Sequence, residues 1–411
     1  MEYTLHTFSN GLRLAHKQTE NTQIAHCGVF INAGSRDEKE TQIGLAHLLE
    51  HMLFKGTQKR NTNQVLNRLE VVGGDLNAFT TKDKTIVHAS VVKDHFDRAI
   101  ELLVDVTFNS SFPVKPLERE KRVICEEIDM YLDAPEERIF DEFQEMFYPG
   151  HPLGNNILGD KETILNFSQE DIRNFVQERY FANEIILVVV APITFQKSLR
   201  VCKKHLEPLE LQEGTVLREP PADIEPFDTV KANGFAQSHV LIGASAYPMD
   251  HPDRAALMLL ANMLGGPGLN SLLNLKLREK HAYTYSVECN YQSLTDSGFV
   301  TIYFGTDKKN INRGKKAVMR ELENLRNKPL SPAMFKKYQT QFRGQLIMAE
   351  ESNSSLMFVI GRSLLDLGYV ESLEEVLDKI EEITPEQLQR VAQDVFNPSK
   401  LSFLTYVPNK V

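Results

Sequence analysis

Three residues near the start of the chain, His47, Glu50 and His51, form the pattern His-x-x-Glu-His. On a helix the two histidines stand four positions apart, so both imidazoles project from the same face. A neutral imidazole is a good zinc ligand, and Glu50 can reach a water on the metal without itself being a ligand. Zinc lowers the pKa of such a water to about 7, and a carboxylate can take the proton and later pass it to a leaving amine. The pattern therefore indicates metal-assisted hydrolysis, although a helix with two unrelated histidines stays the alternative for so short a motif.

A catalytic zinc usually has a third protein ligand and one open position. The acidic segment LEREKRVICEEIDMYLD, residues 117–133, is the best source of that ligand. Glu126 and Glu127 are adjacent and differ by about 100° around a helix, whereas Glu120 and Glu127 are seven positions apart and share a face. These residues alone leave the choice open, and a solvated acidic helix is the alternative reading.

Hydrophobic periodicity predicts the elements that would position these residues. Residues 44–54 have the apolar spacing of a helix, and residues 75–92 read as strand, turn and strand. A long helix should start at Pro116, run towards Met146, and break or kink at Pro135. The other expected strands span 3–8, 12–17, 24–34, 185–192, 239–247, 286–292, 298–306 and 401–407, and the other expected helices span 62–72, 95–107, 169–179, 252–264, 270–280, 309–326, 331–349, 353–366, 371–380 and 385–395.

The length of 411 residues is too great for one compact core and suggests two domains of about 200 residues. A segment rich in Pro and Glu, residues 207–234, reads as a linker or as a linker with an edge strand. The order of strands and helices is similar on both sides of it, which suggests two copies of one α+β domain. We therefore expect a first domain at 1–207 with the metal site, a linker at 208–234 and a second domain at 235–411.

The overall composition narrows the function and the compartment. A net charge of −10, from 56 acidic and 46 basic residues, disfavours nucleic-acid binding. It would suit cationic peptides, although a soluble acidic surface is the simpler explanation. The four cysteines, at 27, 125, 202 and 289, are far apart and predict reduced thiols in a reducing compartment. Neither a signal peptide nor an apolar stretch of about 20 residues is visible, so we expect a cytoplasmic protein, or a periplasmic one if a leader has been removed.

The segments HLLEHMLFKGT and VICEEIDM together resemble the pitrilysin/insulysin family of zinc peptidases, the inverzincins, which includes the mitochondrial processing peptidase. In that family the third ligand is a Glu about 76 positions after the second His, and here 127 − 51 = 76. The resemblance therefore implies a Zn²⁺ held by His47, His51 and Glu127, with Glu50 as the catalytic base. It also implies that Glu120, seven residues before Glu127, supports the site from behind the ligands.

The resemblance covers nearly the whole chain. The segment VVGGDLNAFTTKDKT is similar to a family hairpin whose edge strand receives the substrate backbone, which implies that Asn77 and Ala78 bind substrate. In LGGPGLNSLLNLKLREKHAYTYS, Arg278 and Tyr285 have the family's seven-residue spacing. By that likeness Tyr285 donates a hydrogen bond to the developing oxyanion and Arg278 grips the substrate backbone. Here His-Ala at 281–282 replaces a common Arg-Gly, a departure that could alter substrate preference.

The family resemblance implies two similar α/β-sandwich domains, each a mostly antiparallel sheet covered by helices, that form half of a clamshell. It implies a zinc endopeptidase that cleaves peptides or small unfolded polypeptides inside a chamber. Since relatives of this length build the chamber from two chains, we expect a homodimer or a heterodimer with a related chain. The alternative is a non-catalytic structural or partner subunit, against which the intact metal-binding motif argues.

Overall fold

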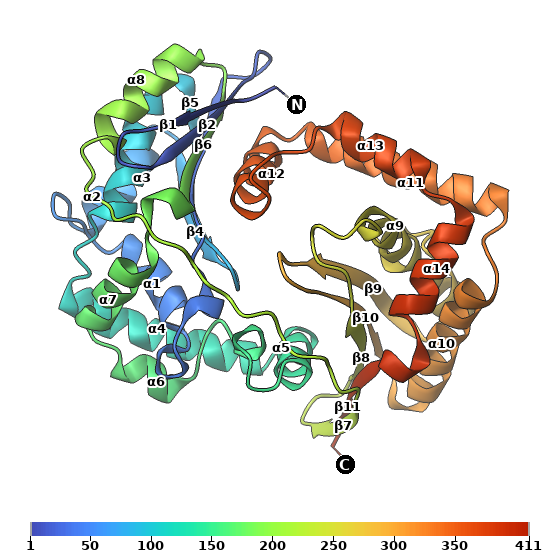
Figure 1. Cartoon of the computed structure of the whole chain (residues 1–411). Helices are drawn as coiled ribbons and strands as arrows, with labels where there is room; N and C mark the ends of the chain where they lie inside the picture. The colour runs from blue at the N-terminus through green and yellow to red at the C-terminus, as the bar shows by residue number, and fades with distance from the viewer. Residues whose placement is uncertain (1, 410–411) are drawn as a thin grey trace. The chain divides into compact units, whose positions relative to one another are not determined.

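The computed structural model describes residues 2–409, which form two compact units (Figure 1). Unit 1 contains the residues up to Met130 together with Asn155–Glu219 and Ala349–Glu371. Unit 2 contains Tyr131–Gly154, Pro220–Met348 and the residues from Ser372 onward. Each unit therefore draws on both halves of the chain.

Unit 1 is built on a six-stranded sheet with the order β1-β2-β6-β3-β5-β4. All neighbouring strands are antiparallel except β2 and β6, which are parallel. The hairpin of β1 and β2 turns around Asn10 and Gly11, between the two strands expected at 3–8 and 12–17. The strands are β1 (Thr4–Thr7), β2 (Arg13–Gln18), β3 (Ile24–Ile31), β4 (Asp75–Thr80), β5 (Thr85–Val92) and β6 (Ile185–Ala191).

Unit 2 is built on a five-stranded sheet with the order β7-β11-β8-β10-β9. Its strands correspond one by one to β2-β6-β3-β5-β4 of unit 1, and β7 and β11 form the equivalent parallel pair. This shared topology confirms the prediction of two similar α/β domains with mostly antiparallel sheets. The strands are β7 (Asp228–Asn233), β8 (Ser238–Ser245), β9 (Thr284–Ser293), β10 (Gly298–Thr306) and β11 (Ser402–Pro408).

Both faces of the unit 1 sheet are covered by helices. Along β6, Leu187 belongs to the core on one face, whereas Ile186 and Val188 belong to the core on the other, as the alternation of side chains along a strand requires. The first core lies under helices of the first half of the chain, and the second lies under α12, whose Met357 and Ile360 are buried there. These helices are α1 (Leu45–Leu53), α2 (Thr62–Glu70), α3 (Phe96–Phe108), α4 (Val114–Leu132), α6 (Lys161–Asn166), α7 (Gln169–Arg179), α8 (Phe195–Leu206) and α12 (Asn353–Asp366).

Unit 2 repeats this layering. Its main core lies between one face of the sheet and helices of the second half of the chain, and α5 covers the other face with Ile139, Phe143 and Phe147. The helices are α5 (Pro135–Phe147), α9 (Arg254–Gly265), the π-helical turn η6 (Asn274–Lys280), α10 (Ile311–Asn327), α11 (Pro332–Glu350), α13 (Leu373–Glu382) and α14 (Pro385–Val395).

The two halves of the chain thus exchange one helix each. Helix α5 precedes the predicted linker but packs on the sheet of unit 2, and α12 follows the linker but packs on the sheet of unit 1. The predicted boundaries at 207 and 235 did not include this exchange. An amphipathic pattern shows that a helix has a face to bury but not which sheet covers that face.

Several element boundaries differ from the sequence prediction. Helix α4 starts at Val114, two residues before Pro116, and the chain breaks before Pro135 as expected. The helix expected at 270–280 is largely π-helical, and the segment 207–234 has no regular structure until the edge strand β7. No helix in residues 2–409 combines the length and the apolar character needed to cross a membrane.

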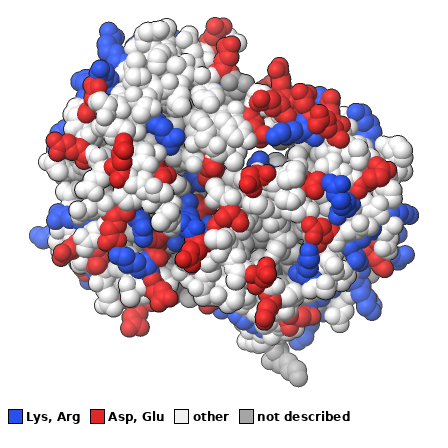
Figure 2. Space-filling view, viewed as in Figure 1, with Lys and Arg blue, Asp and Glu red and all other residues white. Residues whose placement is uncertain are grey.

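The surface in Figure 2 carries a mixture of charges. Lys and Arg side chains are interspersed with Asp and Glu over the visible face, and acidic side chains gather where α13, with the sequence LEEVLDKIEE, lies in Figure 1. The visible face offers no extended basic surface of the kind that phosphate backbones require.

Candidate metal centre

The His-x-x-Glu-His motif lies on α1, a short helix whose position is fixed by burial. Leu48, Leu49 and Met52 are fully buried in the core of unit 1. His47 and His51 project from a shared face, with ring centroids 4.6 Å apart. The helix starts after Gly44, which has a φ of +94° and leaves no room for a Cβ, because that atom would lie 2.9 Å from the backbone oxygen of Leu158. A glycine is therefore required at this turn.

Glu38 closes the N-terminus of α1. Its carboxyl oxygens accept hydrogen bonds from the backbone N–H groups of Gly44, at 3.0 Å, and Ala46, at 2.7 Å. Burial raises the pKa of Glu38 to about 8, an increase that these two backbone hydrogen bonds partly offset. The side chain satisfies donors that a helix start otherwise leaves unpaired, and so it anchors the helix that carries the histidines.

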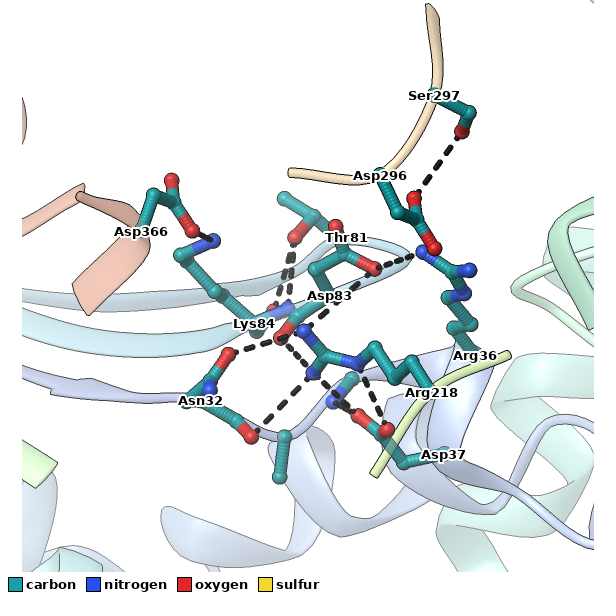
Figure 3. Close-up of polar contacts among 12 residues, drawn as sticks. Asn32, Arg36, Asp37, Thr81, Asp83, Lys84, Arg218, Asp296, Ser297 and Asp366 are labelled. Atoms are coloured by element: carbon teal, nitrogen blue, oxygen red, sulfur yellow. Dashed lines mark hydrogen bonds and ion pairs between the residues drawn. The ribbon is translucent and has the colours of Figure 1, made fainter. Parts of the chain in front are cut away.

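The segment before α1 is tied down by the network shown in Figure 3. Arg218 donates to both carboxylate oxygens of Asp37, at 2.9 and 2.7 Å. The same guanidinium donates to Asn32 Oδ1 on the loop after β3, at 3.0 Å, and to the backbone oxygen of Asp83 in the β4–β5 turn, at 2.7 Å. Asp37 in turn accepts from the backbone N–H of Gly34. Arg218, a residue of the predicted linker, thus connects the segment before α1 to the ends of strands in the unit 1 sheet.

His47, His51 and Glu127 converge as a set of three possible metal ligands, the one such group found within residues 2–409. Their donor atoms all lie within 4.8 Å of one another. Glu127, on α4, lies 3.9 Å from His47 Nε2 and 3.7 Å from His51 Nε2. Glu126 is exposed and outside the group. The structure therefore places Glu127, the residue that the family spacing implied, beside the two histidines, and leaves Glu126 outside the group.

The protonation of His47 suits a metal ligand. Burial, together with the smaller effect of the neighbouring His51, lowers the pKa of His47 to about 4, so the imidazole is neutral at neutral pH. Its Nδ1 is buried without a hydrogen-bond partner among the described residues. Two imidazoles and one carboxylate make a donor set of the type that holds catalytic zinc, so the residues present fit that ion.

Glu120 orients His51 from behind, as the resemblance implied. Its Oε2 lies 3.3 Å from His51 Nδ1, and its Oε1 accepts from Lys55 Nζ at 2.8 Å. Burial raises the pKa of Glu120, but the hydrogen bonds from His51 and Lys55 outweigh burial and leave the pKa below its usual value. A charged Glu120 favours the tautomer of His51 with its proton on Nδ1, which leaves Nε2 free to face Glu127.

Glu50 lies on the same helix but outside the ligand group. Its Oε2 accepts a hydrogen bond of 2.7 Å from the hydroxyl of Thr80, the last residue of β4. Burial raises the pKa of Glu50, and the hydrogen bond from Thr80 acts in the opposite direction. A half-buried carboxylate held beside three ligands, with a raised pKa, has the properties of a general base.

Asn77 and Ala78 lie on β4, the outermost strand of the unit 1 sheet. They pair with His88 and Val87 of β5, and no described strand pairs with the other side of β4. An open edge presents backbone N–H and C=O groups that an extended peptide can join as an additional strand. Thr80 is the last residue of β4 and donates a hydrogen bond to Glu50. A peptide paired with this strand would therefore lie close to Glu50.

Arg278 and Tyr285 lie together in unit 2. Both line a cavity of about 750 Å³ with the glycine-rich loop at 265–268, and Tyr285, on the edge strand β9, is 87% exposed. Arg278 belongs to the π-helical turn, a rare conformation that often marks functional positions. Ala282 has a φ of +50°, a conformation that favours glycine. It stands where the family resemblance would place the glycine of an Arg-Gly pair.

Sequence reasoning missed three residues that serve this site: Glu38, Lys55 and Thr80. Lys55 stands four positions after His51 and Thr80 three after Asn77, so both lay within segments already singled out. Their roles depend on contacts with distant elements, and no periodicity along the chain reports such contacts.

Comparisons with known proteins agree with this fold and show the family to which the chain belongs. The family model of insulinase, peptidase family M16, matches residues 13–161, and the model of the peptidase M16 inactive domain matches residues 166–342. The chain belongs to peptidase family M16.

Curated relatives match over nearly their full length. An uncharacterized zinc protease of Bacillus subtilis, YmxG, is 30% identical over 392 residues, which cover 95% of each chain. A Schizosaccharomyces pombe protein named "Probable mitochondrial-processing peptidase subunit beta" is 29% identical over 403 residues, covering 95% of this chain and 88% of its own length. Zinc is the metal that the name of the B. subtilis relative gives.

Two solved structures share the fold. A protease from Helicobacter pylori superposes with a TM-score of 0.91 at 24% identity, covering 99% of both chains. A peptidase M16 inactive domain from Pseudomonas fluorescens superposes with a TM-score of 0.92 at 19% identity, covering 100% of this chain and 99% of its own.

Proposed function

We propose that this chain is a zinc-dependent endopeptidase. The observation that carries the proposal is the convergence of His47, His51 and Glu127 with Glu50 beside them, held by Thr80. A decayed metal site would have no need of the Glu120–His51 contact or of a fixed carboxylate next to the ligands.

His47, His51 and Glu127 would hold the ion. Zinc bound there supplies a Lewis acid that polarises a scissile carbonyl and acidifies water. Glu50 accepts the proton of the attacking water on its carboxylate and delivers it to the leaving amine. The hydroxyl of Thr80 keeps that carboxylate in one orientation, at 2.7 Å from its Oε2. The raised pKa of Glu50 makes it a better proton acceptor than a solvent-exposed carboxylate.

The substrate proposed for this site is an extended stretch of peptide or of a small unfolded polypeptide. Such a segment would pair with β4 along Asn77 and Ala78, since that edge is open in unit 1. Recognition through backbone groups gives loose sequence specificity. The assignments of Arg278 to the substrate backbone and of Tyr285 to the oxyanion stay predictions from the family resemblance.

Glu50→Gln tests the proposal. The amide keeps the size of the side chain but cannot take a proton, so the variant should bind zinc like the parent and lose hydrolysis of a quenched peptide library. Glu126→Gln is the matched control, because Glu126 is an exposed neighbour of the third ligand outside the ligand group. If Glu50→Gln cleaves as fast as the parent, the role given to Glu50 is wrong.

A second candidate is a subunit that works with a related chain, catalytic or not. The observation in its favour is the similarity to the S. pombe protein named as a subunit of a processing peptidase. Light scattering of the purified, zinc-loaded chain separates the alternatives. An active homodimer supports a self-sufficient enzyme, and a stable inactive monomer indicates that a partner chain is required.

A further inference from the structure

A cluster of basic side chains occupies a cavity of unit 1 that the proposed peptidase mechanism does not use. The cavity has a volume of about 450 Å³ and lies between α2, the start of α3 and the loop that follows α1. Four of its seven lining residues are cationic and none is acidic, in a chain with a net charge of −10. The lining residues are Lys59, Arg60, Gln64, Asn67, Arg68, Val71 and Arg98.

Two of these guanidinium groups are fixed by carboxylates of α3. Arg60 Nη1 donates to Asp105 at 2.5 Å, and its Nη2 donates to both oxygens of Glu101, at 2.6 and 2.8 Å. Arg68 Nε donates to Glu101 at 3.3 Å. Asp105 is buried and Glu101 is mostly buried. Their hydrogen bonds already hold both guanidinium groups in place, so binding a ligand would cost little conformational entropy at these two side chains.

The other two cations have no acidic counterpart. Arg98 Nη1 donates to the backbone oxygen of Arg68 at 3.3 Å, and neither Arg98 nor Lys59 has a carboxylate within ion-pair distance in the described part of the chain. Four cations against the two carboxylates leave an excess of two positive charges, since 4 − 2 = 2. Like charges gathered at one cavity repel each other, and a multivalent anion removes that cost.

We propose that this cavity binds a small anion with two or more phosphate groups. Guanidinium groups match phosphate oxygens in geometry as well as charge, and the lysine adds a mobile point charge. The cavity is shallow and open to solvent, and its volume of about 450 Å³ leaves room for more than a single phosphate group. A nucleic acid fits less well, because the acidic charge of the whole chain would repel it.

One loop connects the cavity to the candidate metal centre. The loop carrying Lys59 and Arg60 starts at Lys55, whose ammonium binds Glu120, the residue that orients His51. Thr57 in the same loop donates to Asp105 at 2.8 Å, the carboxylate that also accepts from Arg60, so the loop contacts Glu120 near the metal centre and Asp105 behind the cavity. Binding of the anion should therefore protect backbone amides of residues 56–61 from hydrogen exchange.

The test is calorimetric titration of the full-length, zinc-loaded chain with inorganic pyrophosphate at constant ionic strength. We expect saturable binding of one pyrophosphate per chain. The double variant Lys59→Ala, Arg98→Ala removes the two unpaired cations without breaking an ion pair, and it should weaken binding at least tenfold. The matched control, Lys197→Ala with Arg200→Ala, removes one exposed lysine and one exposed arginine from α8 of the same unit and should bind like the parent.

Two results would overturn the proposal. Equal affinity in the double variant and the control would mean that the heat comes from non-specific attraction or from removal of zinc by pyrophosphate, which no substitution in this cavity affects. Equally tight binding of citrate would show that the cavity selects multiple charge but not phosphate. Either result leaves the peptidase proposal untouched, since hydrolysis is measured separately.

Discussion

At the scale of single residues, His51 is held from both ring nitrogens. Its Nε2 faces Glu127 at 3.7 Å, and its Nδ1 faces Glu120 at 3.3 Å. Glu120 is itself paired with the half-buried Lys55, so the chain of contacts runs from this lysine to a candidate metal ligand. Such supporting contacts set the tautomer and basicity of a ligand, and their loss typically lowers metal affinity by about 10- to 100-fold.

We therefore expect Glu120→Gln to weaken zinc binding by about tenfold. The amide still fits beside His51 but carries no charge to favour a proton on Nδ1. Competition with a chelator of known affinity measures the effect, and Glu126→Gln, outside the ligand group, serves as the control. Unchanged zinc affinity would show that Glu120 does no more than pair with Lys55.

Thr80 is expected to act on catalysis but not on metal binding. Its hydroxyl contacts Glu50 and no ligand atom of the group. Hydrogen bonds to charged groups contribute about 1.5–3 kcal/mol, and each 1.36 kcal/mol is tenfold in rate. Thr80→Val should therefore lower kcat by roughly 10- to 100-fold, leave KM and zinc content near the parent values, and be rescued by Thr80→Ser. A valine variant with parental kcat would remove Thr80 from the mechanism.

At the scale of elements, the start of α1 determines where the ligands stand. Gly44 turns the chain with a positive φ, and Glu38 accepts the backbone N–H groups of Gly44 and Ala46. A helix of nine residues contributes little stability of its own, so its direction depends on this cap and on its buried leucines.

Removing the cap should cost stability as well as metal affinity. Glu38→Ala leaves two buried backbone donors without an acceptor, a loss of about 1–3 kcal/mol in the free energy of unfolding. Glu38→Gln retains one oxygen acceptor and should lose less. Chemical denaturation measures both, with the exposed neighbour Glu40→Ala as the control. Equal stability of the alanine variant and this control would contradict the capping role.

At the scale of the whole molecule, the exchange of α5 and α12 makes each unit depend on the other half of the chain. Phe143 of α5 lies so close to Gly243 of β8 that a Cβ there would stand 2.5 Å from the ring, and Ile360 of α12 is fully buried against the unit 1 sheet. Neither sheet can bury both of its apolar faces with the helices of its own half alone.

The exchange predicts that core substitutions act on the unit in which the side chain packs. Phe143→Ala should destabilise the chain by about 3–5 kcal/mol and Ile360→Ala by about 2–5 kcal/mol. Hydrogen exchange should rise first in β8 and β11 for Phe143→Ala, and in β3 and β6 for Ile360→Ala. If both variants loosen the same sheet, the assignment of these helices to separate units is wrong.

Much of the fold could be predicted from the sequence because its signals are local. The apolar spacing of α1, the break before Pro135 and the continuous apolar run of β6 are each set by neighbouring residues, and the structure confirms all three. The repeated order of elements predicted two domains of one fold, which the matching sheet orders confirm. The π-helical turn at Asn274–Lys280 was missed, since its residues have an ordinary helical pattern.

By itself, the sequence predicted the His-x-x-Glu-His motif on a helix and, through the spacing of 76 residues and the family resemblance, favoured Glu127 over Glu126 as the third ligand. Only the tertiary structure decided that Thr80 holds Glu50 and that α5 and α12 exchange sheets. The physical reason is one of range. Periodicity and turn chemistry act between residues a few positions apart, whereas the partner of a buried face or of a carboxylate depends on which distant element arrives beside it.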